Sequence, residues 1–331
     1  MRSDATVLLR RGEIAALLSL DECIAAVEQA FRLHAEGRSL PPAVLSVPAA
    51  AGAFHVKAAG LSLGRTYFAA KTNGNFPANP ARFGKPAIQG VVVLCDGGDG
   101  TPLALLDSIE ITILRTGAAT AVAAKFLARS DSTVVTICGC GHQGRIQLRA
   151  LARVFSLQRA YAFDHDSDQA RRFAEELAGE LGIEVRPVAD LSAAVGQSDI
   201  CVTCTPARKY FLHRNHVAPG TFIAAVGADN PDKQEVDPAL LRSSKIVVDS
   251  LEQCATIGEL HHALALGLLT RDQVYAELSE VVAGGKAGRS SRDEIIVFDS
   301  TGTALQDVAA AAAAFEKAIR TGVGRRINLA D

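Results

Sequence analysis

The sequence has no excess of charge of either sign. Its 331 residues contain 34 Lys and Arg against 36 Asp and Glu, which gives a formal net charge of −2. Binding to nucleic acid phosphates requires a basic surplus, so the composition argues against a nucleic-acid partner. The sequence contains no block of like charges, so no disordered charged tail is predicted. With 48% hydrophobic and 21% charged residues, the composition is that of an ordinary globular protein.

The N-terminus lacks a long hydrophobic segment. The apolar run 7–9 ends in charge at Arg10, which is typical neither of a signal peptide nor of a membrane span. We therefore expect a cytoplasmic protein without a membrane partner. A chain of 331 residues is long for one hydrophobic core, so two domains are expected.

A set of metal ligands is also missing from the pattern. Cys201 and Cys204 have CxxC spacing, but they lie in an apolar run typical of a strand, and no second pair follows. The histidine pairs at 213/216 and 261/262 lack a carboxylate or cysteine at ligand spacing. We interpret the seven scattered cysteines as small buried hydrophobic residues. No metal site is predicted.

The most informative segment is a hydrophobic strand over 133–138 that ends in Gly139-x-Gly141-x-x-Gly144. The first glycine permits a tight turn, and the second permits close approach of the backbone to a pyrophosphate. The third lets the following helix pack close to the strand, and the N-terminus of that helix offers free N–H groups to phosphates.

The residues after this motif complete a dinucleotide-binding unit. A helix over 146–154 leads to a strand over 159–163, and Asp164 stands at the end of that strand. A carboxylate there can bind both ribose hydroxyls of NAD and repels a 2′-phosphate. This order of strand, glycine turn, helix, strand and acidic residue predicts a Rossmann fold with NAD(H) as the cofactor and NADP(H) as the alternative.

The first part of the chain has a different pattern. Ser19 and Glu22 form a capping box that starts a helix running to Gly37, and short strands separated by turn residues fill 40–106. This pattern favours an antiparallel α+β domain. An alanine-rich helix over 108–128 then leads into the glycine motif.

After Asp164 the chain alternates between helices and short apolar strands. Helices are expected over 169–181 and 191–195, and strands over 184–188, 200–205, 221–226, 245–249 and 295–298. Such alternation is typical of a doubly wound parallel sheet covered on both faces. A closing helix over 307–321 is expected to return to the first domain. The predicted domains are therefore 1–115 with 307–331, for substrate binding and dimerisation, and 116–306, for NAD(P) binding.

Two cations in apolar surroundings are candidates for the substrate site. Lys71 follows the apolar run 67–70, and burial would lower its pKa until it exchanges protons near neutrality. The alternative is a lysine whose ammonium reaches solvent. Arg115 lies in an otherwise uncharged helical segment, where it needs an anion, either a substrate carboxylate or a structural ion-pair partner.

Other candidates carry weaker signals. Asp229 follows the strand over 221–226 and can act as acid or base toward an amine or imine, or simply cap a turn. Alternation puts His55 and Lys57 on the same face of a strand, which we expect to point to solvent. Gln89 is the remaining candidate.

These residues resemble one family closely, the ornithine cyclodeaminase and mu-crystallin family of nicotinamide-dependent amino and imino acid enzymes. The resemblance covers nearly the whole chain and rests on Lys71-x-x-x-Asn75-x-Pro77, 114–120, the glycine motif with 163–166, 226–235 and 298–308. It implies a homodimer in which first-domain strands of two subunits form a shared barrel.

The resemblance also implies roles for individual residues. Arg115 would hold the α-carboxylate of an imino or amino acid, Lys71 would lie in the same substrate site, and Asp229 would act as acid or base. The implied cofactor site consists of Thr116, Gly139, Gly141, His142, Gln143, Gly144, Asp164, Thr203, Thr205, Val226 and Ser300.

One departure from the family pattern bears on the activity. Members that bind amino acids carry an arginine after the Pro-Pro of the first strand, whereas this chain has Ala43. Lys57 is the candidate to replace it, with His55 and Gln89 as further substrate-binding candidates. The altered pocket resembles that of Δ1-pyrroline-2-carboxylate reductases. Ornithine cyclodeamination, alanine-dehydrogenase-like amination of a 2-oxo acid and non-catalytic binding of the mu-crystallin kind are the alternatives.

Overall fold

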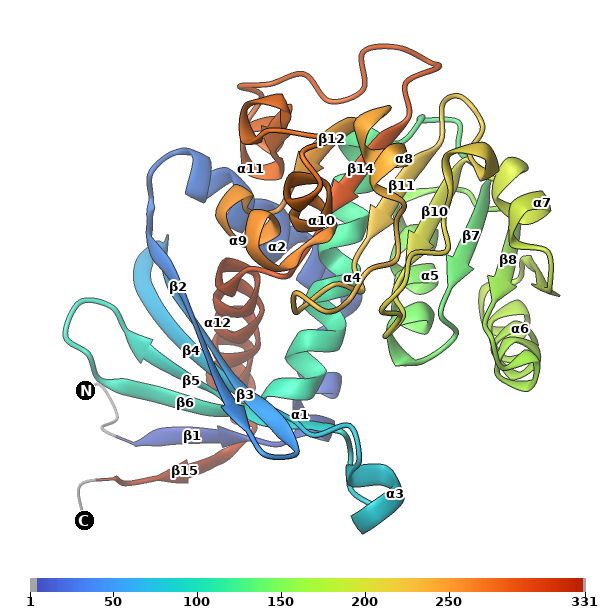
Figure 1. Cartoon of the computed structure of the whole chain (residues 1–331). Coiled ribbons are helices and arrows are strands. Elements are labelled where there is room, and N and C mark those ends of the chain that lie inside the picture. The colour runs from blue at the N-terminus through green and yellow to red at the C-terminus, as the bar shows by residue number, and fades with distance from the viewer. Residues whose placement is uncertain (1–4, 330–331) are drawn as a thin grey trace. The chain divides into compact units, whose positions relative to one another are not determined.

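The computed structural model describes residues 5–329 (Figure 1). By its internal contacts the chain divides into two compact units: unit 1, Met1–Arg115 with Thr303–Asp331, and unit 2, Thr116–Gly302. Each unit has its own sheet. Across the described range, no helix combines the length and the apolar character needed to cross a membrane.

Unit 1 is built on a mixed sheet. Its strands, in spatial order, are β15 (Arg325–Ile327), β1 (Thr6–Leu9), β6 (Pro102–Asp107), β5 (Ile88–Asp96), β4 (Arg65–Asn75), β3 (Gly52–Leu63) and β2 (Ser39–Ala49). Neighbours are antiparallel except β1 and β6, which are parallel. The predicted antiparallel α+β domain is thus found with one parallel pair, which is possible because parallel neighbours need a long connection and the whole segment between β1 and β6 supplies it.

The helices of unit 1 are α1 (Arg11–Leu17), α2 (Leu20–Ala35), α3 (Asn79–Phe83) and α12 (Ala304–Thr321), and α4 (Ser108–Leu127) contains the junction with unit 2. The predicted capping box is confirmed, since Ser19 Oγ accepts the N–H of Glu22 and Glu22 accepts the N–H of Ser19. Helix α1 was not predicted. Helix α12 starts before the expected residue 307 and packs on α2 and on β3, β4 and β5, so the C-terminal helix does return to the first domain.

Unit 2 contains a parallel sheet, as predicted. Its strands, in spatial order, are β13 (Ala276–Glu277), β12 (Lys245–Val248), β14 (Ile296–Asp299), β11 (Phe222–Ala225), β10 (Ile200–Thr203), β7 (Val134–Cys138), β8 (Arg159–Phe163) and β9 (Glu184–Val188). Because the chain continues from β7 to β8 on one side and later to β10 on the other, the strand order reverses at β7. Ligands of open α/β sheets bind at the carboxyl ends beside such a reversal.

The helices of unit 2 after α4 are α5 (His142–Val154), α6 (Ser167–Leu181), α7 (Leu191–Gly196), α8 (Pro238–Arg242), α9 (Leu251–Ile257), α10 (Glu259–Ala265) and α11 (Leu278–Val282), with 3₁₀ turns η1 (Arg214–His216) and η2 (Arg271–Gln273). The four short helices between 238 and 282, α8 to α11, were not predicted.

The glycine turn has the local geometry that its sequence predicts. Gly139 adopts a φ of 103°, a conformation that residues with a side chain rarely adopt. A Cβ on Gly144 would lie 2.0 Å from the carbonyl oxygen of Gly139, so the third glycine is required where α5 passes the end of β7. Gly141 is the N-cap residue of α5 and supplies no side-chain cap.

Candidate functional site

A cavity of about 620 Å³ lies at the carboxyl ends of β7, β8 and β10 in unit 2. Its lining consists of Gly139, Gly141, Phe163, Asp164, His165, Gln169, Cys204, Thr205, Pro206, Ala207 and Phe211. Four residues predicted to bind the cofactor, Gly139, Gly141, Asp164 and Thr205, are among them. The cavity thus extends from the glycine turn to Asp164, the acidic residue that follows the next strand.

Asp164 is held by backbone N–H groups. Its carboxylate accepts hydrogen bonds from Cys140 N at 2.8 Å and from Asp166 N at 3.1 Å. Burial alone would raise the pKa of Asp164, but these hydrogen bonds and His165 outweigh it and keep the pKa below its usual value. The side chain is therefore an ionised, oriented acceptor in the lining of the cavity.

The other predicted cofactor residues lie outside this lining. Gly144, His142 and Gln143 belong to the first turn of α5, Thr203 ends β10, Val226 and Ser300 follow β11 and β14, and Thr116 lies in α4.

The apolar walls of the cavity were not predicted. The ring centroids of Phe163 and Phe211 lie 6.4 Å apart. Phe163 directly precedes Asp164, whereas nothing in the sequence around Phe211 indicates its position. With the glycine turn, the helix N-terminus and the ionised Asp164, these walls fit a dinucleotide, whose adenine and ribose need an apolar slot and a hydroxyl acceptor.

A buried glutamate links two loops beside this cavity. Glu235, which is fully buried, accepts hydrogen bonds from Thr205 N at 2.6 Å, from Thr205 Oγ1 at 2.7 Å and from Gly227 N at 3.0 Å. Glu259 in turn accepts the N–H groups of Glu235 at 2.8 Å and Val236 at 3.0 Å. The loops after β10 and β11 are thereby fixed to each other.

Two buried aspartates extend this arrangement to the loop after β14. Asp299 accepts the N–H of Leu260 at 2.8 Å. Asp249 accepts Ser300 Oγ at 2.9 Å and Gly302 N at 2.6 Å. Ser300, predicted to line the cofactor, is thus oriented by Asp249.

Burial dominates the protonation of these carboxyl groups. It raises the pKa of Glu235, raises that of Glu259 well above its usual value and raises that of Asp299 to about 7. A Cβ on Gly227 would lie 2.3 Å from a carboxylate oxygen of Glu235, so a side chain at this position would displace that carboxylate. None of the three acids was a predicted site residue, because their partners are distant backbone groups.

A second cluster lies in unit 1 and contains Lys71, Arg115 and Asp307. Lys71 Nζ donates to Asp307 Oδ1 at 2.8 Å, and Arg115 Nε donates to the same oxygen at 3.0 Å. Lys71 Nζ also donates to Thr112 Oγ1 at 3.3 Å, and Arg115 Nη1 donates to Gln306 Oε1 at 2.9 Å. The side chains of Lys71, Arg115 and Asp307 are only 5%, 7% and 2% exposed.

The charges of this cluster do not balance. Two cations meet one carboxylate, and Lys57 adds a further positive field at Lys71 and Asp307. Burial, followed by the charges of Arg115 and Lys57, lowers the pKa of Lys71 to about 7 against the opposing effect of Asp307. The same cations keep the pKa of Asp307 below its usual value despite burial. A buried surplus of positive charge favours an anionic ligand.

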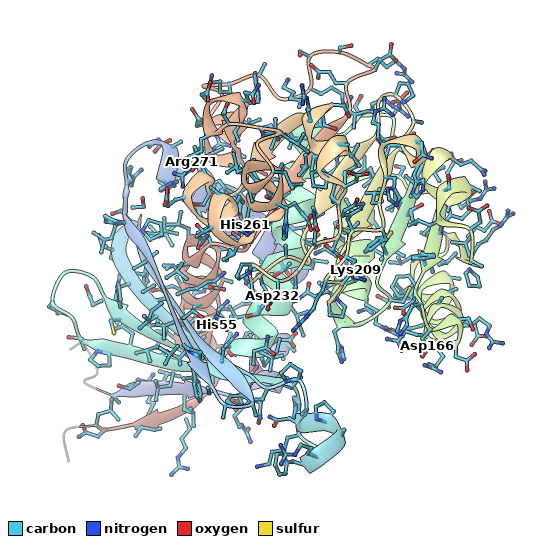
Figure 2. The ribbon with its side chains drawn as sticks, viewed as in Figure 1. His55, Asp166, Lys209, Asp232, His261 and Arg271 are labelled. Carbon is cyan, nitrogen blue, oxygen red and sulfur yellow. The ribbon has the colours of Figure 1, made fainter. Side chains whose placement is uncertain are left out.

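The face of β3 that carries His55 and Lys57 does not point freely to solvent. Lys57 is directly paired with Lys71 of β4, and the same face continues into the buried Ala59 and Leu61. His55 is half-buried near the far end of this face, where its Nδ1 lies 3.1 Å from Ser46 Oγ (Figure 2). The prediction of a solvent face is therefore wrong, because the face packs toward the helices of unit 1.

Two further positions lie on the other face of this sheet. Ala43 pairs with Ala58, so its side chain emerges opposite to that of Lys57. Gln89 is exposed and pairs with Gly74 of β4. Residues 71 and 74 lie on opposite faces of that strand, so Gln89 points away from the Lys71 face. The register therefore brings Lys57, but not Gln89, to the Lys71 cluster.

Asp229 lies in unit 2, after β11. Its side chain is 44% exposed and forms an ion pair of 2.8 Å with Lys233. Lys71 and Asp229, the two predicted proton carriers, thus stand in different surroundings, one desolvated and one exposed.

Asp307 and Gln306 were not predicted from the sequence. Asp307 is the one charged residue in the alanine-rich stretch 304–315 of this helix, and the argument applied to the lone Arg115 would have found it. The cysteines mostly behave as predicted: Cys95 and Cys204 are half-buried and the others are buried. Within residues 5–329, no group of three or more His, Cys, Asp or Glu side chains is arranged to hold a metal ion.

Comparison with known proteins gives matches along nearly the whole chain. The sequence profile of the ornithine cyclodeaminase/mu-crystallin family matches residues 4–322. Alanine dehydrogenase of Archaeoglobus fulgidus is 40% identical over 98% of both chains. Iminosuccinate reductase of Paracoccus denitrificans is 34% identical over 96% of this chain and 98% of that protein. A Δ1-pyrroline-2-carboxylate reductase of Bacillus cereus is 34% identical over 75% of this chain and 76% of that protein.

Solved structures of similar proteins also match nearly the whole chain. An archaeal alanine dehydrogenase dimer with bound NAD superposes with a TM-score of 0.94 at 39% identity, covering 98% of this chain and 99% of that one. Thermococcus litoralis Δ1-pyrroline-2-carboxylate reductase in complex with NADH and L-proline has a TM-score of 0.92 at 35% identity, covering 97% and 100%. The Paracoccus denitrificans iminosuccinate reductase in complex with NAD+ has a TM-score of 0.90 at 32% identity, covering 98% and 99%.

Replacing Glu235 by alanine tests the buried carboxylate of unit 2. Glu235→Ala leaves the N–H groups of Thr205 and Gly227 without their acceptor, so we expect the free energy of unfolding to fall by roughly 2–4 kcal/mol. Urea denaturation measures this loss. The control is Glu252→Ala, at a side chain that is 80% exposed, with an expected change below about 0.5 kcal/mol. Equal effects of the two substitutions would contradict the linking role of Glu235.

Proposed function

The chain belongs to the ornithine cyclodeaminase/mu-crystallin family, and from this premise we propose that it reduces a cyclic imino acid with NADH. The products would be L-proline from Δ1-pyrroline-2-carboxylate or L-pipecolate from Δ1-piperideine-2-carboxylate. The observation that carries the proposal is the buried cluster of Lys71 and Arg115 around the single carboxylate of Asp307. A 2-carboxylate supplies the missing negative charge, and an ammonium that titrates near neutrality supplies a proton.

Unit 2 would hold the cofactor. Gly139 and Gly141 would take the pyrophosphate with the N-terminus of α5, and Asp164 would accept hydrogen bonds from the ribose hydroxyls. The ionised Asp164 favours NAD(H) over NADP(H), because a 2′-phosphate would meet a like charge. NAD or NADH in the three similar structures supports this assignment. Bound NADH supplies the hydride.

Arg115 would bind the substrate carboxylate. Its Nε and Nη1 are engaged by Asp307 and Gln306, which orients the guanidinium and leaves Nη2 for the ligand. Because the site is desolvated, the charge-assisted hydrogen bond is stronger than one on the surface. Lys57, paired with Lys71 across the strands, would add a second attraction for the anion.

Lys71 would protonate the imine nitrogen. As the hydride reaches C2 of the ring, the C=N double bond becomes a single bond and the nitrogen takes one proton from the Lys71 ammonium. A donor with a pKa of about 7 is matched to work near neutral pH. Asp229 is the second candidate, but its exposed ion pair with Lys233 makes it the weaker donor in this structure.

Alanine-dehydrogenase-like reductive amination is the second candidate function. It is favoured by the 40% identity to the Archaeoglobus fulgidus alanine dehydrogenase over 98% of both chains, whereas the Bacillus cereus reductase matches 75% of this chain. Amination of a 2-oxo acid proceeds through an open-chain 2-imino acid, which offers the same carboxylate and C=N bond to Arg115 and Lys71.

A second copy of the chain is the proposed partner. Strand β2 is an edge of the unit 1 sheet, and its Val44, Leu45 and Val47 are 45%, 58% and 46% exposed. An exposed apolar edge strand needs a cover. The NAD-bound dimer of the archaeal alanine dehydrogenase supports a homodimer formed through this sheet, in a protein that we propose to be cytoplasmic.

A substrate comparison tests the function. We expect the purified protein to oxidise NADH with Δ1-pyrroline-2-carboxylate or Δ1-piperideine-2-carboxylate at a kcat/KM at least tenfold above that with pyruvate plus ammonia. Spectrophotometry at 340 nm, the absorbance of NADH, measures both reactions. A higher kcat/KM with pyruvate and ammonia would establish the alanine-dehydrogenase candidate instead. Ammonia released from L-ornithine with NAD+ would identify a cyclodeaminase, and NADH binding without any turnover would indicate a binding protein.

The cofactor preference depends on Asp164. Asp164→Ser removes the carboxylate that repels the 2′-phosphate, so the ratio of kcat/KM for NADH to that for NADPH should fall at least tenfold, about 1.4 kcal/mol. The control is Asp168→Ser in the first turn of α6, where the side chain is 59% exposed, and it should leave the ratio unchanged. An unchanged ratio in Asp164→Ser would remove Asp164 from the ribose site.

Light scattering tests the dimer. The protein should have twice the mass of one chain, and Leu45→Glu on β2 should shift it to the monomer, because a charge cannot be buried there without a partner. The matched control is Leu266→Glu in unit 2, at a residue that is 66% exposed, which should remain dimeric. A monomeric wild-type protein would contradict the proposal.

A further inference from the structure

We propose that Asp307 is a positioning residue that fixes Lys71 and Arg115 in the arrangement in which they meet the imino acid, an inference that rests on the proposed function. Asp307 lies in the first turn of α12, whereas Lys71 lies in β4 and Arg115 in α4. One oxygen atom, Asp307 Oδ1, accepts hydrogen bonds from both cations, at 2.8 Å and 3.0 Å. Three elements are thus joined at a single buried atom.

These bonds orient both cations. Gln306, the residue before Asp307, holds Nη1 of Arg115 while Asp307 holds Nε, so the plane of the guanidinium is set by two successive residues of α12. Lys71 uses two of its three N–H groups on Asp307 and Thr112. One N–H of the ammonium and Nη2 of the guanidinium therefore remain for the substrate, in directions that the other bonds determine.

Stability alone explains Asp307 poorly. A buried ion pair seldom stabilises a fold more than apolar residues of similar size would. The second oxygen of Asp307 is buried and has no hydrogen-bond partner in the structure, so half of the carboxylate's capacity is unused. Around it, α12 consists largely of buried alanines. A buried acid with one unpaired oxygen at this position is better explained by its hydrogen bonds to Lys71 and Arg115.

Asp307 also sets the charge balance at Lys71. The charged groups that act on Lys71 are Arg115 from α4, Lys57 from β3 and Asp307 from α12. Of these, only Asp307 stabilises the ammonium, and its removal would leave Lys71 among cations. The ammonium would then lose its proton at lower pH, and the imine would lose its donor.

The experiment uses Asp307→Asn in the full-length protein. For wild type, kcat/KM for reduction of Δ1-pyrroline-2-carboxylate should fall as the pH rises through about 7, where Lys71 loses its proton. In Asp307→Asn this fall should move down by at least one pH unit, a tenfold change in the proton affinity of Lys71. The KM for the imino acid should rise at least fivefold, while the KM for NADH should stay within twofold of wild type.

Two further variants separate charge from position. Asp307→Glu keeps the charge but displaces the carboxylate, so the pH of the fall should stay near that of wild type while the KM for the imino acid rises. Glu316→Gln removes another carboxylate of α12, one that bonds Tyr67, and should change neither quantity. If Asp307→Asn does not fold, Asp307→Glu decides: a raised KM for the imino acid alone supports positioning, and an unchanged KM overturns it.

An unmoved pH profile in Asp307→Asn, or an equal rise of both KM values, would overturn the proposal. Failure of the proposed function is a separate outcome, seen when wild-type protein reduces no imino acid. The positioning role is then tested by NMR titration of ¹³C-labelled lysine, with Lys71 assigned through Lys71→Met. A lower midpoint for Lys71 in Asp307→Asn than in wild type supports the role, and an equal midpoint overturns it.

Discussion

The burial of two cations against one carboxylate is the constraint on which the proposed chemistry of this protein depends. Lys71 and Arg115 come from β4 and α4, and both reach Asp307 of α12. Helix α12 must therefore return to the first unit, although its sequence follows that of the second. Burial makes the surplus positive charge expensive, and a carboxylate ligand relieves that cost. The same burial brings the pKa of Lys71 to about 7, so in the proposed function substrate binding and proton transfer would have one physical origin.

The second unit follows a different principle, since its buried charges are acidic and contact backbone N–H groups. Glu235 holds the loops after β10 and β11, and Asp249 holds Ser300 after β14. A parallel sheet leaves such loops at the carboxyl ends of its strands, where a dinucleotide needs fixed backbone groups. The buried acids fix that backbone at the cost of raised pKa values. Rigidity at the sheet edge is thus obtained from carboxyl groups that need not touch the ligand.

Much of the fold and of the candidate site was predictable from the sequence, wherever patterns of neighbouring residues determine the structure. The glycine turn, the succession of strand, helix and strand around it, Asp164 and the isolated charges Lys71 and Arg115 all follow from patterns within a few residues. Asp307 was open to the same lone-charge rule but was interpreted only as part of a helix. The parallel pairing of β1 with β6, the wall residue Phe211 and the bonds of Glu235 were out of reach, because they depend on contacts between distant segments. The Lys71–Asp307 bond joins residues 236 positions apart, which no periodicity reveals.

A crystal structure of the protein with NADH and L-proline would show directly whether the Lys71 cluster binds the substrate. We expect the proline carboxylate within hydrogen-bond distance of the Arg115 guanidinium and the proline nitrogen beside Lys71 Nζ, with Asp307 still bonded to both cations. A proline carboxylate bound away from Arg115, with Lys71 and Arg115 contacting only Asp307, Gln306 and Thr112, would contradict that expectation.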